Sequence, residues 1–196
     1  MKAVVLIGGI GSGKSTVLGM FSSLGAGVVS LDSIGHYILT TPEVKFDLAR
    51  TFGTGIFDEK GEVVRSLLAQ AAFDCPEHTE WLNGITHPAI MKECRRRVAE
   101  LGSIHPVVMV EVTSGEISRK AFPWADAIVA VSAPEDMRIA RAVARGEQTE
   151  EDVRARLALQ PTDGEREAIA DYVVRNDGSL DDVRRQVDEV WRELAE

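Results

Sequence analysis

The sequence lacks a surplus of positive charge. Its 196 residues include 31 acidic side chains against 22 lysines and arginines, which gives a formal net charge of -9. Proteins that coat nucleic acids or anionic membranes need the opposite balance, because phosphate groups attract cations. We therefore expect no nucleic acid and no membrane among its partners, while a local basic site stays compatible with this composition.

Long apolar runs are also missing. No stretch of 18 or more apolar residues occurs, and the short apolar segment at residues 3–7 is followed by no cleavage-type pattern. Neither a membrane-spanning helix nor a signal peptide is expected. The sequence predicts a cytoplasmic protein, and no pattern in it predicts an oligomeric state.

Cysteine is scarce. Cys75 and Cys94 form no C-x-x-C pair, and we see no metal-type arrangement of cysteine and histidine around them. Two thiols in a chain with a full apolar core are most often ordinary, half-buried side chains. We expect neither a redox role nor a metal-binding role for them.

Internal repeats, low-complexity tracts and long linkers are absent, which predicts a single domain over residues 1–196. Short apolar runs alternate with helical patterns, as expected for a doubly wound α/β fold around a parallel sheet. Five strands are predicted, at residues 3–7, 28–31, 107–112, 127–131 and 171–174. A last helix is predicted after Ser179 and Asp182, which have the spacing of a capping box.

The interval between the second and third predicted strands spans about 75 residues, far more than a crossover needs. Apolar residues recur there at helical spacing, as in Val44, Leu48 and Phe52, so we predict an inserted helical lobe. Arginines concentrate between Arg138 and Arg156 in this otherwise acidic chain. We predict that this basic stretch forms part of a short helical lid.

One motif carries specific chemistry. The segment from Gly8 to Ser15, GGIGSGKS, fits G-x-x-x-x-G-K-[ST] and lies between a predicted buried strand and a predicted helix. Its glycines let backbone N–H groups surround phosphate oxygens, and the helix start adds a positive dipole end. Lys14 supplies a mobile charge to the β- and γ-phosphates of a nucleotide, and the Ser15 hydroxyl is suited to hold Mg²⁺.

Two acids stand where strands end. Asp32 follows the second strand and is suited to accept the proton of a hydroxyl nucleophile, although a helix N-cap at Asp32 or Ser33 is an equally good interpretation. Glu111 ends the third strand and is suited to hold Mg²⁺ through a water, or it is an ordinary solvated acid. A base-reading N-K-x-D motif is absent, which disfavours a regulatory GTPase.

Arg141 and Arg145 stand four residues apart on one predicted helix face. Their charges repel each other there unless an anion lies close by, which favours a phosphate partner. A kinase typically closes a positively charged lid over the transferred phosphate, to keep water away from it. The alternative is a solvated helix face.

With these motifs in place, the sequence resembles the dephospho-CoA kinases over nearly its whole length. The matching segments, in order, are Gly8 to Thr16, Leu24 to Ile34, Phe52 to Phe73, Trp81 to Pro88, Arg141 to Gln160 and Ala170 to Ser179. The resemblance implies a P-loop NTPase fold, a three-layer α/β/α domain with a five-stranded parallel sheet. Its core would comprise residues 1–32, 105–135 and 165–196, with an acceptor-binding insertion at 33–104 and a lid at 138–162.

The resemblance also implies the reaction: transfer of the γ-phosphate of ATP, with Mg²⁺, to the ribose 3′-hydroxyl of dephospho-CoA. Implied ATP-binding residues are Gly8, Gly9, Gly11, Ser12, Gly13, Lys14, Ser15, Thr16, Arg145, Asn176 and Gly178. Implied catalytic residues are Asp32 as base, Lys14, and Arg141 as a lid charge, with His36, Arg65 and His87 beside Asp32 on the acceptor side. For His87 the alternative is a histidine that caps a helix start ahead of Pro88.

Three segments depart from the family's usual pattern. Ile7 stands where threonine is usual, Ser30 replaces the first acid of D-A-D, and Thr113-Ser114-Gly115 replaces P-L-L. These departures keep two alternatives open. One is a divergent kinase for another nucleotide-like or sugar hydroxyl, and the other is an ATP-binding relative without catalysis.

Overall fold

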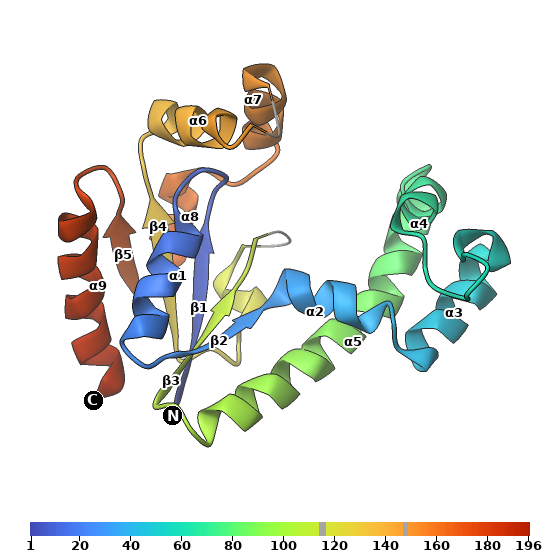
Figure 1. Cartoon of the computed structure of the whole chain (residues 1–196), viewed down its shortest axis with the longest axis horizontal. Helices are drawn as coiled ribbons and strands as arrows, with labels where there is room; N and C mark the ends of the chain where they lie inside the picture. Colours follow the sequence, from blue (N-terminus) through green and yellow to red (C-terminus); the bar gives the residue numbers. More distant parts are fainter. Residues whose placement is uncertain (114–116, 147–148) are drawn as a thin grey trace. The chain divides into compact units, whose positions relative to one another are not determined.

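Five parallel strands form the centre of the fold in this computed structural model, which describes residues 1–113, 117–146 and 149–196. The strands are β1 (Lys2–Gly8), β2 (Gly27–Ser30), β3 (Val107–Glu111), β4 (Ala127–Ser132) and β5 (Tyr172–Arg175). Their order across the sheet is β2-β3-β1-β4-β5 (Figure 1). The sheet confirms the predicted strands, with boundaries that move by one residue.

Two helices cover one face of this sheet, α1 (Lys14–Ser23) and α9 (Leu180–Ala195). Val17 and Phe21 of α1 are fully buried against the sheet, and the same core contains Val183, Val187, Val190 and Leu194 of α9. The capping box that starts α9 is present, with the Ser179 hydroxyl accepting from the Asp182 backbone N–H and donating to the Asp182 carboxylate. Hydrophobic spacing and cap chemistry therefore predicted this layer correctly.

Shorter elements complete this part of the chain. Helix α8 (Asp163–Ile169) contacts β4 and β1, and in Figure 1 it lies behind the sheet while α1 lies in front. A 3₁₀ turn, η2 (Arg119–Ala121), precedes β4. With helices on both faces of a parallel sheet, the chain has the α/β/α architecture of P-loop NTPases.

The predicted lid segment contains two helices, α6 (Glu135–Ala144) and α7 (Glu150–Ala158). They pack on each other through Ile139, Ala142 and Val153, and Ile10 of the glycine-rich loop packs against the same cluster. Thr149 and Asp152 form a capping box at the start of α7. The loop that follows β1 is thus in apolar contact with the lid helices.

The chain divides into two compact units. The first comprises Met1–Ser30 and Val98–Glu196 and holds the sheet; the second is Leu31–Arg97. The second unit contains α2 (Leu31–Ile38), α3 (Pro42–Phe52), the 3₁₀ turn η1 (Thr54–Ile56), α4 (Arg65–Ala72) and most of α5 (Pro76–Gly102). The insertion predicted at residues 33–104 covers these same helices.

The second unit buries apolar side chains from each of its short elements. These are Ile34 and Ile38 of α2, Val44 and Leu48 of α3, Ile56 of η1, and Leu68 and Ala72 of α4. A tight turn between η1 and α4 is closed by an antiparallel bridge between Phe57 and Val63. Within this turn the backbone N–H of Gly61 donates to the carbonyl of Asp58 at 3.0 Å, and Gly61 has a positive φ of 72°.

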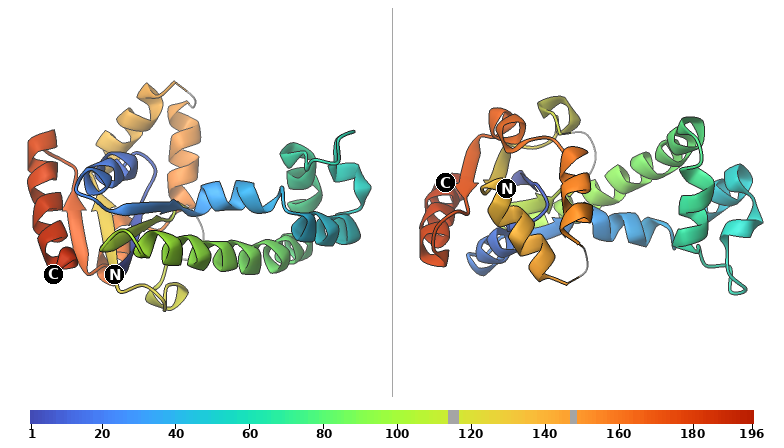
Figure 2. Two further views of the ribbon diagram at one scale, coloured as in Figure 1. Left: turned by 60° about the horizontal axis from the view of Figure 1, so that its bottom comes forward. Right: turned by 90° about the horizontal axis from the view of Figure 1, so that it is seen from above.

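Helix α5 corrects one interpretation of His87. The helix runs without interruption from Pro76 to Gly102, so that His87 and Pro88 lie in its interior (Figure 2). A histidine that caps a helix start ahead of Pro88 is therefore wrong. The proline costs the helix a single backbone donor, and the helical positions on both sides of it still form.

No helix in the described ranges is both long enough and apolar enough to cross a membrane. This agrees with the absence of long apolar runs in the sequence.

Of the positions that depart from the family pattern, Ser114 and Gly115 lie outside the described residues, whereas Ile7, Ser30 and Thr113 lie within them.

Candidate active site

The glycine-rich loop joins β1 to α1, and its last glycine starts the helix. Gly13 is the N-cap of α1 with φ of 93° and ψ of 22°, a left-handed conformation that favours glycine. No acidic residue occurs in the first turn of α1. The backbone N–H groups and the positive dipole end of this helix therefore face the loop with no carboxylate in their own turn, which is the arrangement that binds phosphate.

Close packing of other side chains against the loop also requires glycine at two of its positions. A Cβ atom at Gly9 would overlap the guanidinium of Arg138, and one at Gly13 would overlap the side-chain amide of Asn176. The Asn176 amide donates to the backbone carbonyl of Ser12 at 2.8 Å. Arg138 and Asn176, which lie far from the loop in the sequence, therefore pack directly against its backbone.

Arg138 belongs to a buried ion cluster. It is 5% exposed, donates from Nε to the carbonyl of Ile10 at 3.0 Å and pairs with Asp163 at 2.9 Å. Arg166, which is 4% exposed, pairs with the same carboxylate oxygen at 3.2 Å. Burial lowers the pKa of Arg166, and the paired Asp163 opposes this shift.

Two guanidinium groups thus share one carboxylate, which leaves a net positive charge behind the loop. This corrects the interpretation of the basic stretch from Arg138 to Arg156. Arg138 is not an exposed lid cation, because its side chain points into the protein and holds the loop. Sequence alone gave no signal for this cluster, since Asp163 and Arg166 lie about 25 residues further along.

A pocket of about 240 Å³ opens in front of the loop. It is lined by Gly9, Ile10, Gly11, Gly13, Lys14, Ser15, Glu111, Thr113, Arg145, Arg156 and Gln160. Three cations therefore face one carboxylate across this pocket. The excess of positive charge suits a polyphosphate.

Lys14 and Gln160 are both anchored to the loop. The Lys14 ammonium donates to the carbonyl of Gly8 at 2.7 Å, and the backbone N–H of Ile10 donates to the side-chain oxygen of Gln160 at 3.1 Å. Arg145 and Arg156 are exposed on the side of α6 and α7. Arg156 and Gln160 resemble the family's lid, but the sequence did not mark them as phosphate contacts.

Arg141 forms a hydrogen bond with the backbone of Asn176. The guanidinium of Arg141 donates to the backbone carbonyl of Asn176 at 2.9 Å, which ties α6 to the end of β5. Neither residue lines the phosphate pocket. Gly178, two residues further on, is exposed, and a Cβ there would lie 3.0 Å from the Asp182 carboxylate.

The oxygen donors in the pocket fit Mg²⁺. Ser15 offers a hydroxyl and Glu111 a carboxylate, and both line the pocket beside Lys14. Mg²⁺ is held in proteins by one or two such oxygen ligands together with waters and substrate phosphates. Glu111 is the last residue of β3 and pairs in register with Leu6 of β1 and Ser30 of β2.

The residues predicted for the acceptor all lie in the second unit and are exposed. Asp32 and His36 stand in the first and last turns of α2, Arg65 is the first residue of α4, and His87 lies within α5. Asp32 is the second residue of α2, past the position of an N-cap. Their roles toward a substrate stay predictions.

The comparison with known proteins identifies the family. The family model of dephospho-CoA kinase matches residues 2–182, which is most of the chain. The chain belongs to the dephospho-CoA kinase family. It is 35% identical to a dephospho-CoA kinase of Corynebacterium diphtheriae, with 100% of this chain and 98% of the relative aligned. It is 38% identical to the one of Syntrophotalea carbinolica, with 95% and 89% aligned.

Solved structures agree with the fold. A Thermus thermophilus protein, TT1252, superimposes with a TM-score of 0.81 at 28% identity and covers 98% of this chain and 97% of its own. The dephospho-CoA kinase of Campylobacter jejuni superimposes with a TM-score of 0.65 at 23% identity, with 98% and 97% covered, a likeness in fold alone. As a member of the dephospho-CoA kinase family, the chain is a phosphotransferase with an alcohol acceptor.

Proposed function

We propose that this chain transfers the γ-phosphoryl group of ATP to the 3′-hydroxyl of the ribose of dephospho-CoA, giving coenzyme A and ADP. The observation that carries the proposal is the pocket in front of the glycine-rich loop, where Lys14, Arg145 and Arg156 converge. Family membership over residues 2–182 supports the choice of acceptor.

The phosphates of ATP bind to the first unit. The backbone of Gly9 to Gly13 and the start of α1 surround the β-phosphate, since this segment presents N–H groups and a positive dipole end. Lys14 turns from the Gly8 carbonyl toward the β- and γ-phosphate oxygens. Arg145 and Arg156 neutralise charge from the lid side, where they line the same pocket.

Ser15 and Glu111 are the residues that would hold Mg²⁺, Ser15 through its hydroxyl and Glu111 through a water. Bound there, Mg²⁺ would supply positive charge that neutralises part of the negative charge of the phosphates. The support is the donor set itself, two hard oxygen donors beside Lys14 in one pocket. Thr113 contributes a further hydroxyl to the lining.

Asp32 is our proposed catalytic base. It follows the last residue of β2 by two positions, and the carboxyl end of β2 belongs to the same sheet edge as the start of the glycine-rich loop. Asp32 accepts the proton of the 3′-hydroxyl while the oxygen bonds to the γ-phosphorus and the bond to the bridging oxygen of ADP breaks. His36, Arg65 and His87 are the proposed contacts to dephospho-CoA itself.

Lys14, Arg145 and Arg156 are the proposed cations that stabilise the transition state of phosphoryl transfer. The transferred phosphoryl group passes through a loose transition state with negative charge on its equatorial oxygens. Lys14, once turned from the Gly8 carbonyl, stabilises that charge together with Arg145 and Arg156, and a contact that strengthens in the transition state lowers the barrier more than it tightens ground-state binding. Arg141 supports the lid through the Asn176 carbonyl, and its predicted role as a lid charge stays part of the proposal.

The test is an acceptor panel with Mg-ATP, with ADP formation as the readout. We expect rapid ADP formation with dephospho-CoA and none above background with coenzyme A, which already carries the 3′-phosphate. Shikimate serves as a second control, because shikimate kinases share the fold of this chain. Equal ADP formation with all three compounds, or with no acceptor at all, would refute the proposed substrate.

A further inference from the structure

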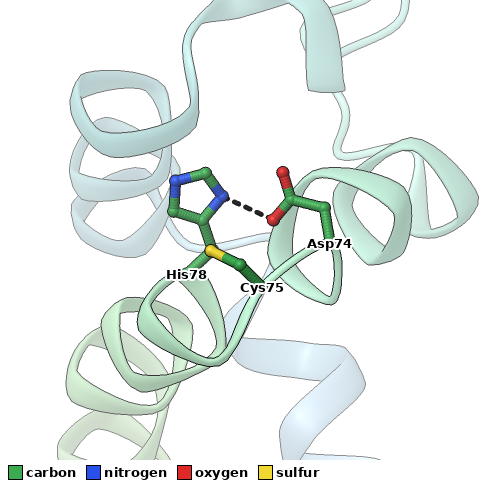
Figure 3. Close-up of side chains that lie close together, drawn as sticks. All are labelled: Asp74, Cys75 and His78. Atoms are coloured by element: carbon green, nitrogen blue, oxygen red, sulfur yellow. Dashed lines mark hydrogen bonds and ion pairs between the residues drawn. The ribbon is translucent and has the colours of Figure 1, made fainter.

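Three side chains of different chemistry meet where α4 ends and α5 begins, in the second unit. They are Asp74, Cys75 and His78, and one ligand atom of each lies within 4.8 Å of the other two (Figure 3). Among the described residues, this is the one group of at least three such side chains that meets this distance. Neither the ATP pocket nor the proposed acceptor residues include any of them.

Local structure explains why they meet. Helix α4 ends at Ala72 and α5 begins at Pro76, so that Cys75 immediately precedes the first turn of α5. The Thr79 hydroxyl bonds to the carbonyls of Ala72 at 2.9 Å and Cys75 at 3.3 Å, which fixes the junction. His78 stands three residues after Cys75, in that first turn.

The imidazole of His78 is oriented from several sides. Its Nδ1 lies 2.6 Å from a carboxylate oxygen of Asp74 and 3.1 Å from the carbonyl of Ala71. The ring packs at 4.7 Å on Trp81 and edge-on against Phe52 at 6.1 Å, measured between ring centroids. A ring held in this way loses little rotational freedom when it coordinates an ion.

We propose that Asp74, Cys75 and His78 form a binding site for a zinc-class divalent cation. A thiolate, an imidazole and a carboxylate are the three ligand types that Zn²⁺ accepts, in a tetrahedron whose fourth position is taken by water. Zinc–ligand bonds of about 2.0–2.3 Å place neighbouring ligand atoms roughly 3.3–3.6 Å apart. The 2.6 Å between His78 Nδ1 and the Asp74 carboxylate is shorter than this, so an ion that binds both groups takes the place of their hydrogen bond.

Cys75 is suited to supply the thiolate, in contrast to the other cysteine. It is partly exposed at the start of α5, where the helix dipole favours negative charge. Cys94 is buried, and burial raises the pKa of its thiol to about 11. The proposal gives Cys75 a role beyond the ordinary side chain that the sequence predicts, and the three-residue spacing from Cys75 to His78 is the corresponding signal in the sequence.

The site differs in kind from the proposed Mg²⁺ position. Mg²⁺ prefers oxygen ligands and octahedral geometry, whereas a thiolate ligand selects softer ions. A cation bound here would join the linker that follows α4 to the first turn of α5, and these two helices carry Arg65 and His87. We therefore expect zinc to raise the melting temperature of the full-length protein, because it binds the folded junction.

Cobalt(II) titration of the metal-free, full-length protein tests this proposal without any activity readout. We expect a thiolate-to-cobalt charge-transfer band in the near ultraviolet that saturates at a single equivalent. Zn²⁺ should abolish the band and excess Mg²⁺ should leave it in place. The variant Cys75→Ser should lose the band, and His78→Gln should keep it while the affinity falls at least about tenfold.

Two matched controls make the result specific. Cys94→Ala removes the other thiol, and Glu77→Gln removes an exposed acid of the same helix turn; both should bind cobalt as the parent protein does. Circular dichroism establishes that each variant is folded. Absence of the band in the parent protein, or an unchanged band in folded Cys75→Ser, would overturn the proposal while leaving the kinase assignment untouched.

Discussion

Lys14 is the residue on which the phosphate pocket depends most directly. It follows the left-handed Gly13 and begins α1, so that its side chain shares the pocket with the loop N–H groups and Ser15. Its ammonium bonds to the Gly8 carbonyl, a contact that it can exchange for a phosphate oxygen. The neighbouring lid arginines add charge, but they approach from another element of the chain.

Replacement of Lys14 by alanine should lower kcat/KM for dephospho-CoA phosphorylation by about 10²–10³, the usual cost of removing one charge-stabilising donor. Steady-state kinetics measures this loss. Lys2→Ala is the control, since that ammonium is occupied by the carbonyl of Glu193 at the far end of β1. Full activity of Lys14→Ala would exclude the loop as the phosphate site.

A substitution at Asp32 tests its proposed role as the catalytic base. Asp32→Asn should lower kcat by about 10²–10⁴ and leave ATP affinity unchanged, because the amide cannot accept the hydroxyl proton. Calorimetry with ATP and turnover with dephospho-CoA together separate these effects. Glu43→Gln, an acid in the first turn of α3, is the matched control. Equal turnover of Asp32→Asn and the parent protein would show that another group takes the proton.

At the scale of elements, side-chain hydrogen bonds connect the glycine-rich loop with α6 and with the end of β5, and connect α6 with α8. Arg138 of α6 holds the Ile10 carbonyl, Asp163 of α8 holds Arg138, and Asn176 holds the Ser12 carbonyl. The two buried arginines depend on a single carboxylate. This carboxylate offsets the desolvation cost of burying their charges.

Asp163→Asn should therefore destabilise the protein by about 3–5 kcal/mol, since it leaves two buried guanidinium groups without a counter-ion. Urea unfolding followed by tryptophan fluorescence measures the change. Asp181→Asn serves as the control because Asp181 forms an exposed pair with Arg184, and it should leave the unfolding midpoint in place. Equal midpoints for Asp163→Asn and the parent would contradict the buried cluster.

Helix α5 carries a second charge cluster with a measurable pH dependence. Hydrogen bonds from Arg96 and Arg97 lower the pKa of Glu93 to about 2, from an ordinary value of 4.5. The folded state thus favours the carboxylate, so that its stabilisation is complete above pH 4.5 and is lost as the pH falls toward 2.

Glu93→Gln should lower the free energy of unfolding by about 1–3 kcal/mol at pH 7, a range that allows for solvent screening of the partly exposed arginines. The difference from the parent should shrink between pH 4.5 and pH 2. Urea titrations at several pH values measure it. A difference that stays constant down to pH 2 would show that the Glu93 pairs do not act through ionisation.

For the molecule as a whole, local patterns in the sequence predicted the elements well. The apolar runs and the motif from Gly8 to Ser15 were sufficient to predict the parallel sheet and the loop at the end of β1. Contacts between distant segments were not predictable in this way. The bond from Asn176 to Ser12 joins residues 164 positions apart, and no periodicity encodes such a partner.

Arg138 shows why the site was predicted only in part. By sequence it is one of several helical arginines, and only the fold separates it from Arg145 and Arg156, which line the pocket. Burial of a charged side chain depends on a counter-ion supplied by another element, here Asp163. Composition therefore indicated that cations gather in this region, and the structure divides them into structural and pocket-lining groups.

The central claim is that this chain phosphorylates the ribose 3′-hydroxyl of dephospho-CoA. Tandem mass spectrometry of the product, after incubation with Mg-ATP carrying an ¹⁸O-labelled γ-phosphate, tests it most directly. We predict a product heavier by one labelled phosphoryl group, with fragments that place the group on the ribose 3′ oxygen, and none with Lys14→Ala. Unmodified dephospho-CoA, or label at any other oxygen, would contradict the account.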